Sequence, residues 1–252
     1  MTVHSRSAIL LALLLLAPSS VANCQEAQLS ELISVDPKPF DELEATNEFV
    51  MFDGFDGKLL LNWHPVRFDE THVSLGKHRG KFTITTQAGT IHAGETPTAK
   101  NIFLIANPLN AQTDFVMTTC LTDFHPTMIY QQAGLICYDD DDNYLKWDAE
   151  FNGSEPALCI LPEEKGVSNF RHAALPTGGK GLWLRLTKRG TSYEFASSTD
   201  GNAYNVHGEQ TWGSGAPKSL GLIAKNGGRQ AAELDAQFEF FELRTPPPAR
   251  DK

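Results

Sequence analysis

The segment from Asp139 to Glu150 concentrates the side chains that could do chemistry. Four consecutive aspartates, Asp139 to Asp142, precede two further carboxylates, Asp148 and Glu150, on an alternating stretch. Two carboxylates on one strand face could serve a retaining glycosidase, which needs them about 5 to 5.5 Å apart. Lys146 would share that face and keep Glu150 ionised, which opposes a proton-donor role. A hydrolase is therefore the less favoured interpretation of these carboxylates.

The aspartate run also matches part of a calcium loop. It fills positions 1, 3, 5 and 12 of an EF-hand with Asp139, Asp141, Asn143 and Glu150. Position 6, where the sharp turn needs glycine, is Tyr144, and the flanking segments have the pattern of strands, so we reject the EF-hand. A different structural Ca²⁺ site stays open, and no other cofactor is expected. Its candidate ligands are Asp53, Asp56, Asp139, Asp141 and Asp235.

The favoured interpretation of the run is an acidic turn between two strands, residues 133–138 and 143–151. Alternation along the second strand places one set of side chains on a core face: Leu145, Trp147, Ala149 and Phe151. The opposite face carries Tyr144, Lys146, Asp148 and Glu150. This polar face is either ordinary solvent-facing surface or the floor of a ligand groove.

Residues 181–188 form a second two-faced segment. Leu182, Leu184 and Leu186 are predicted to point inward, which leaves Trp183 and Arg185 outward. An outward tryptophan beside an arginine could stack on a sugar ring and hydrogen-bond its hydroxyls, or it could pack under a loop. If both polar faces lie on one sheet, they form a single binding patch of Tyr144, Lys146, Asp148, Glu150, Trp183 and Arg185.

Short strands account for the whole pattern between residues 49 and 244, where no long run has helical periodicity. Turn signals such as Asp200-Gly201 separate them. The predicted strands are residues 81–86, 101–106, 114–122, 133–138, 143–151, 157–161, 181–188, 192–197, 219–224 and 236–243. About ten strands with short turns imply a single all-β domain of two packed sheets. The lack of an internal repeat argues against a propeller or a solenoid.

Five motifs occur in an order that resembles a known family. They are Gln132 to Leu135, Lys146 with Glu150, Ser168-Asn169-Phe170, Trp183 to Gly190, and Ser198 to Gly201. Together they resemble the concanavalin A-like domains of the regulation-of-enolase-protein type, a domain of unknown function, and the β-sandwich appended to family-43 β-xylosidases. The resemblance covers about residues 52–243 and implies an antiparallel jelly-roll β-sandwich. The family's Ser-Asp-Trp reads Ser-Asn-Phe here, and the aromatic residue expected after the Ser-x-Asp-Gly turn is Tyr204.

The resemblance leaves function open, because this superfamily includes lectins, glycan-binding modules and glucanases. A glucanase strand of this superfamily carries two glutamates around an aspartate, and Lys146 stands where the first would be. We therefore expect a non-catalytic, lectin-like domain whose partner is a glycan or polysaccharide. The alternatives are a structural or protein-interaction domain of the cell envelope without a small ligand, and a polysaccharide hydrolase.

Residues 1–22 predict a secretory signal peptide, because His4 and Arg6 precede an apolar run and small residues end at Ala22. The run is shorter than the ~20 apolar residues that span a bilayer, and no transmembrane segment is expected. We expect a secreted or periplasmic protein with an acidic arm at residues 23–48 and a proline-rich tail at 245–252. The alternative is a lipoprotein anchored through Cys24.

Charge and cysteine content limit the remaining possibilities. The formal net charge of −10 argues against nucleic acid, whose binding requires basic side chains to neutralise phosphates. Besides Cys24 in the arm, the mature chain has three cysteines, so at most one internal disulfide can form among Cys120, Cys137 and Cys159. Their spacing, without a clustered histidine, does not match a zinc site.

Overall fold

The computed structural model describes residues 49–246 except 93, 214 and 228–230, and strands dominate it. The described chain has one short 3₁₀ helix, η1 (Glu70–His72), and every pair of named strands is antiparallel. No helix among the described residues is long and apolar enough to cross a membrane. The predicted signal peptide, the arm with Cys24 and most of the predicted tail lie outside the described residues.

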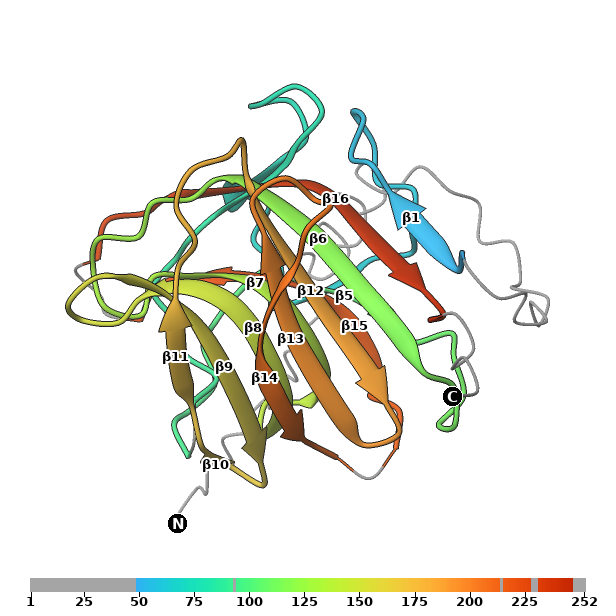
Figure 1. The fold of residues 1–252 in the computed structure, drawn as a ribbon. Helices are drawn as coiled ribbons and strands as arrows, with labels where there is room; N and C mark the ends of the chain where they lie inside the picture. Colours follow the sequence, from blue (N-terminus) through green and yellow to red (C-terminus); the bar gives the residue numbers. More distant parts are fainter. Residues whose placement is uncertain (1–48, 93, 214, 228–230, 247–252) are drawn as a thin grey trace, which may run out of the picture.

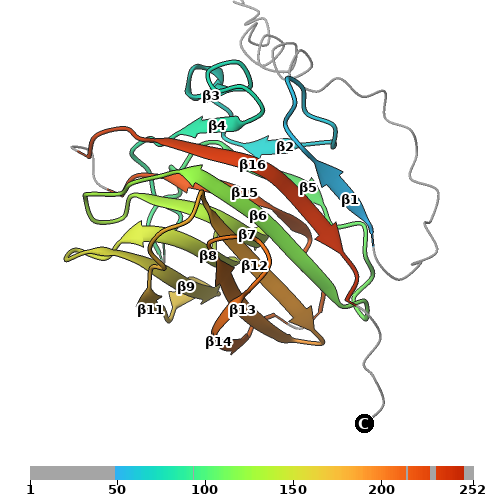
Figure 2. The ribbon, with the colours of Figure 1, turned by 45° about the horizontal axis from the view of Figure 1, so that its top comes forward.

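The strands form two eight-stranded sheets that stack face to face (Figure 1). The β6 sheet runs in the order β14 (Asn205–Thr211), β13 (Ser192–Ser198), β12 (Leu182–Arg189), β6 (Phe115–Asp123), β16 (Asp235–Arg244), β4 (Phe82–Thr85) and β3 (Val73–Ser74), with β1 (Met51–Asp53) beside β16. The β8 sheet runs in the order β10 (Val167–Ser168), β9 (Pro156–Glu164), β8 (Asn143–Phe151), β7 (Gln132–Asp140), β15 (Ser219–Lys225), β5 (Ile102–Ala106) and β2 (His64–Val66), with β11 (Arg171–Ala174) beside β9. Figure 2 shows β3 and β14 at opposite ends of the molecule, as this order requires.

The predicted fold class is confirmed. The ten predicted strands correspond to β4 to β9, β12, β13, β15 and β16, and β8 has the predicted bounds. The structure adds six strands that the pattern does not reveal. Most are very short, and the longest, β14, has a polar sequence and no fully buried residue.

The core fills the space between the two sheets. The β8 sheet contributes the inward side chains Leu145 and Trp147, as alternation predicts, and the β6 sheet contributes Leu184 and Leu186. Trp147 packs 5.6 Å from Phe195 of the opposite sheet, between ring centroids. Burial of these large apolar side chains, at about 1.5–3 kcal/mol each, is the main force that holds the sheets together.

The acidic run forms the tight turn between β7 and β8, as predicted, and its carboxylates are partly engaged. Arg67 donates two hydrogen bonds to Asp141, at 2.7 and 2.8 Å, and the Tyr138 hydroxyl donates a third at 2.9 Å. Burial alone raises the pKa of Asp141, but these hydrogen bonds outweigh it and hold the pKa below its usual range. The turn is thus tied to the body of the protein, and not merely solvated.

Candidate functional site

The polar face of β8 points away from the core and is nevertheless buried. The connection between β4 and β5, around residues 86–101, lies over it and packs Ile91 and Ala99 against the outer side of the sheet. Tyr144, Lys146, Asp148 and Glu150 are each at most 3% exposed. The interpretation of this polar face as ordinary solvent-facing surface is therefore wrong.

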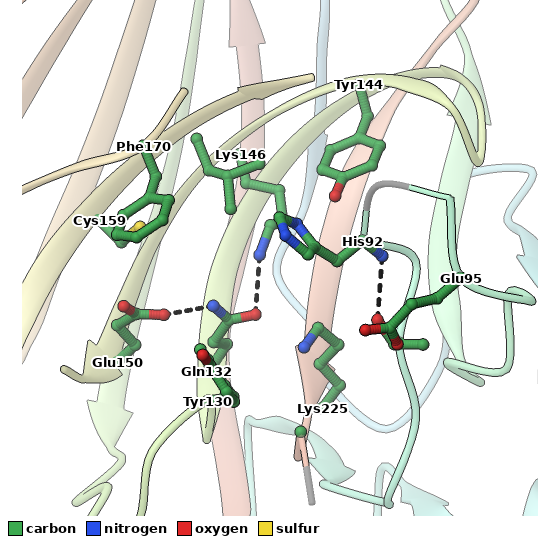
Figure 3. Close-up of a pocket in the computed structure, with 13 residues that line it drawn as sticks. His92, Glu95, Tyr130, Gln132, Tyr144, Lys146, Glu150, Cys159, Phe170 and Lys225 are labelled. Atoms are coloured by element: carbon green, nitrogen blue, oxygen red, sulfur yellow. Dashed lines mark hydrogen bonds between the residues drawn. The ribbon is translucent and has the colours of Figure 1, made fainter. Parts of the chain in front are cut away.

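Beside this cover, the face opens into a cavity of about 270 Å³ (Figure 3). Three of the four predicted β8 residues line the cavity, whereas the fourth, Asp148, is fully buried and does not line it. The cavity is lined by Thr90, His92, Glu95, Tyr130, Gln132, Tyr144, Lys146, Glu150, Cys159, Leu161, Phe170, Lys225 and Gly227. Small-molecule sites are concave, mostly apolar and equipped with a few convergent polar groups, which describes this cavity.

Strand register gathers the polar side chains of the cavity in rows. Lys225 on β15 pairs with Gln132 on β7, which pairs with Glu150 on β8. In the next row, Asp148 pairs with Cys159 on β9, and Cys159 pairs with His172 on β11. Residues of one row share a sheet face, so five strands contribute to a single site.

A chain of hydrogen bonds links the floor of the cavity (Figure 3). The Lys146 ammonium donates to Gln132 Oε1 at 2.7 Å, and Gln132 Nε2 donates to Glu150 Oε2. His172 Nε2 lies 2.5 Å from the other Glu150 oxygen. Lys146 Nζ also lies 3.2 Å from Asp148 Oδ2. Each of these buried ionised groups has a partner, as buried charges require.

The shared burial shifts the pKa values of this cluster. Burial raises the pKa of Asp148 to about 6, although the Lys146 ammonium pulls it down. Burial alone would lower the pKa of Lys146, but the charges of Asp148 and Glu150 outweigh burial and raise it. Burial, reinforced by the charge of Lys146, lowers the pKa of Lys225 to about 7. Perturbed groups gathered in a cavity are a mark of functional sites.

Lys225 differs from its neighbours in having no partner. Its side chain is 6% exposed, and it has neither a hydrogen bond nor an ion pair in the described part of the chain. Figure 3 shows the Lys225 amine pointing into the cavity.

Aromatic residues frame the site. Tyr130 and Phe170 line the cavity and remain 50% and 54% exposed, so both rings stand at its mouth. Tyr144 is buried deeper, and its hydroxyl donates to Glu163 Oε2 at 2.7 Å. Burial and this hydrogen bond raise the pKa of Tyr144. Exposed rings of this kind provide stacking faces for a ligand that enters the cavity.

One group of side chains could hold a metal ion. Glu150, Cys159 and His172 offer an oxygen, a sulfur and a nitrogen within 4.8 Å of one another, a donor set that suits Zn²⁺ better than Ca²⁺. In the structure the imidazole and the carboxylate contact each other directly, and burial raises the pKa of the Cys159 thiol. An ion would therefore have to displace the hydrogen bond and the thiol proton.

The carboxylates proposed as Ca²⁺ ligands are not brought together. Asp53, in the β6 sheet, accepts hydrogen bonds from the backbone of Phe55, Leu60 and Leu61 and from the Trp63 indole. Lys77 and Thr85 bind Asp235 at the start of β16. Asp56 is exposed, whereas Asp139 and Asp141 belong to the turn of the other sheet.

Trp183 and Arg185 do not join the β8 residues, so the single six-residue patch is wrong. They lie on the outer face of β12 in the β6 sheet, on the far side of the core. The Arg185 guanidinium lies 3.5 Å from the ring centroid of Tyr204. The core separates these two residues from the cavity.

Sequence reasoning missed most of the cavity. Gln132 and Lys225 adjoin the predicted strands 133–138 and 219–224, each one residue beyond the predicted end. Extending the alternation by one position would have placed both on the polar face. Nothing local indicates that His172 contacts Glu150, because β11 is short and reaches β9 through a pairing that the sequence does not reveal.

The two antiparallel sheets, which pack face to face, define a jelly-roll β-sandwich domain. The chain belongs to the protein family of unknown function DUF1349, whose model matches residues 69–246. No curated protein matches the chain.

Solved structures resemble this fold at low sequence identity. BlXynB, a GH43 protein from Bacillus licheniformis, matches with a TM-score of 0.67 and 21% identity over 84% of this chain and 41% of its own. The xylan β-1,4-xylosidase from Bacillus halodurans matches with a TM-score of 0.64 and 14% identity, over the same shares. A functionally unknown protein from Saccharomyces cerevisiae matches at 0.57 and 19%, over 73% of this chain and 96% of its own. This chain thus spans about two fifths of the length of the two bacterial proteins, and the likeness shows the fold.

Proposed function

We propose that this protein is an exported, non-catalytic carbohydrate-binding domain whose site is the cavity on the outer face of the β8 sheet. The observation that carries the proposal is the combination of exposed rings, Tyr130 and Phe170, above a rigid polar floor of Gln132, Lys146 and Glu150. Sugars present apolar ring faces and many hydroxyls, so aromatic stacking and fixed hydrogen-bonding groups are the chemistry that recognises them.

The arrangement of carboxylates favours binding over hydrolysis. A retaining glycosidase needs two carboxyl groups that both reach the sugar. Glu150 lines the cavity, but Asp148 has no exposed surface and lies against the Lys146 ammonium. The GH43 likeness supports a carbohydrate context, since the matched proteins include a xylan β-1,4-xylosidase.

A binding screen of the full chain against oligosaccharides and polysaccharides tests the proposal, with reducing-sugar release assayed in the same samples. We expect binding without release, weakened about tenfold by Phe170→Ala, because the loss of about 1.4 kcal/mol of ring contact is a factor of ten. Val206→Ala, an exposed apolar residue on β14, is the matched control and should leave affinity unchanged.

Three outcomes would redirect the interpretation. Sugar release abolished by Glu150→Gln would establish the hydrolase. Loss of binding with a chelator would implicate a metal ion at the Glu150, Cys159 and His172 group. If no sugar in a broad panel bound, the result would favour a protein-interaction domain.

A further inference from the structure

We infer that the sugar bound in this cavity carries a carboxylate, as a uronic acid does, and that Lys225 is the residue that pairs with it. The inference rests on the proposed function and names its ligand class. It starts from a side chain without a hydrogen bond or ion pair to any described residue, an ammonium group nine-tenths buried at the wall of a cavity.

The other charges of the site are already paired within the protein. Lys146 is held by Asp148 and Gln132, and Glu150 is held by Gln132 and His172. Glu163 accepts the hydrogen bond of the Tyr144 hydroxyl. Glu95 also lines the cavity but is exposed to solvent. Among the described residues, an anion that enters the cavity therefore meets one buried charge without a hydrogen bond or ion pair, and that charge is the protonated amine of Lys225.

The backbone holds Lys225 in place. It is the last residue of β15, and the next residue, Asn226, is fully buried. The Asn226 amide donates to Gln87 O at 2.8 Å, and its side chain donates to Ala232 O at 3.2 Å. The ammonium is thus presented from a fixed position, which reduces the entropy lost when a ligand binds.

Burial without a partner makes Lys225 selective between neutral and charged ligands. A buried charge is unfavourable until an opposite charge or strong acceptors replace its lost water. A sugar hydroxyl replaces that water only in part, whereas a carboxylate also neutralises the charge. A cavity of about 270 Å³ is small among ligand sites, and so suits a single sugar ring better than a long stretch of chain.

The test measures the affinity of the full chain for uronic-acid oligosaccharides, each beside its own methyl ester, which removes the charge and keeps the shape. Sodium acetate at matched ionic strength shows whether a simple carboxylate competes. We expect the acid to bind about tenfold more tightly than its ester, which corresponds to about 1.4 kcal/mol. Acetate should not displace it at the concentration of the sugar.

Lys225→Met should bring the affinity for the acid down to that for the ester and leave the affinity for the ester unchanged. Methionine keeps much of the volume of the lysine stem, and an apolar replacement of a buried charge need not destabilise the fold, which thermal unfolding would verify. Lys180→Met, an exposed lysine before β12, is the matched control and should change neither affinity.

Two results would overturn the inference and leave the proposed function intact: equal affinity for acid and ester, or an equal loss for both in Lys225→Met. Competition by acetate as strong as that by the uronic acid would also overturn the inference, because the site would then recognise a carboxylate without the sugar ring. If no sugar bound, whether acidic or neutral, the proposed function would be overturned as well.

Discussion

Lys146 and Asp148, two residues apart on the same face of β8, form an ion pair with 3.2 Å between Nζ and Oδ2, and both side chains are almost fully enclosed. A buried pair adds little net stability relative to an apolar pair, yet breaking it by removing one partner is strongly destabilising. The pair therefore constrains the sequence of β8 more than it stabilises the fold.

Removing the charge of Asp148 alone should destabilise the protein. We expect Asp148→Asn to lower the free energy of unfolding by about 3–5 kcal/mol, because Lys146 would keep a buried charge with only Gln132 as partner. The double variant Lys146→Met with Asp148→Asn should lose less. Urea unfolding measures both. Lys77→Met, which removes an exposed ion pair with Asp235, is the control and should change stability by less than about 1 kcal/mol. A small loss in Asp148→Asn would contradict the role of the pair.

Lys225 should make stability rise with pH above neutrality. The unfolded chain keeps its ordinary pKa of 10.5, whereas burial lowers the pKa in the folded chain to about 7. Between these values the unfolded chain binds more protons, so the free energy of unfolding increases with pH, by at most about 1.4 kcal/mol per pH unit. Urea unfolding between pH 7 and 8 should show this rise in the wild type and a flatter curve in Lys225→Met.

Other groups with shifted pKa values act outside the window from pH 7 to 8. Burial raises the pKa of the three buried cysteine thiols above their ordinary 9.0, so their contribution to stability falls with rising pH above about 8. The pKa of Asp148 is raised to about 6, so the folded chain binds more protons only between about 4 and 6, and stability falls with rising pH there. Burial raises the pKa of Tyr144 above its ordinary 10, which acts at higher pH. Parallel curves for wild type and Lys225→Met between pH 7 and 8 would mean that the amine is not desolvated.

The fold was largely predictable because apolar alternation is a local signal. In β8, Leu145, Trp147 and Ala149 recur at every second position and fixed the strand with its correct bounds. The same reasoning fails for β14, where the register shifts at His207 and no residue is fully buried. An edge strand pairs with one neighbour and is less buried, so its sequence alternates less clearly between apolar and polar residues.

The site was predictable only in part, because it depends on pairings between distant segments. Tyr144, Lys146 and Glu150 could be assigned to one face, but Gln132 and Lys225 lie one residue outside the strands predicted at 133–138 and 219–224. The sheet to which β12 belongs is set by its pairing with β6, about 65 residues earlier in the chain. No local pattern distinguishes that pairing from one with β8, which is why Trp183 was grouped with the wrong face.

Gly134 should tolerate no side chain, because it lies opposite Asp148 where two strands approach closely. A β-carbon there would lie 2.3 Å from Trp147 O and 2.5 Å from Asp148 Cα, both backbone atoms that cannot move away easily. We expect Gly134→Ala to lose about 1–3 kcal/mol in the free energy of unfolding. Gly76→Ala, where a β-carbon meets nothing within 4 Å, is the control in the same urea titration. Equal stability of the two variants would show that the strands separate freely at this point.

Arg185 should matter for packing and not for ligand binding, since it lies on the opposite sheet from the cavity. Its guanidinium stacks 3.5 Å from the centroid of the Tyr204 ring, an interaction worth about 1 kcal/mol at a half-buried site. We expect Arg185→Ala to lower the free energy of unfolding by about that amount and to leave sugar affinity unchanged. Calorimetric titration beside Phe170→Ala provides the comparison. If Arg185→Ala weakened sugar binding as much as Phe170→Ala does, the ligand would have to contact the β6 sheet, and the site would lie on the other side of the sandwich.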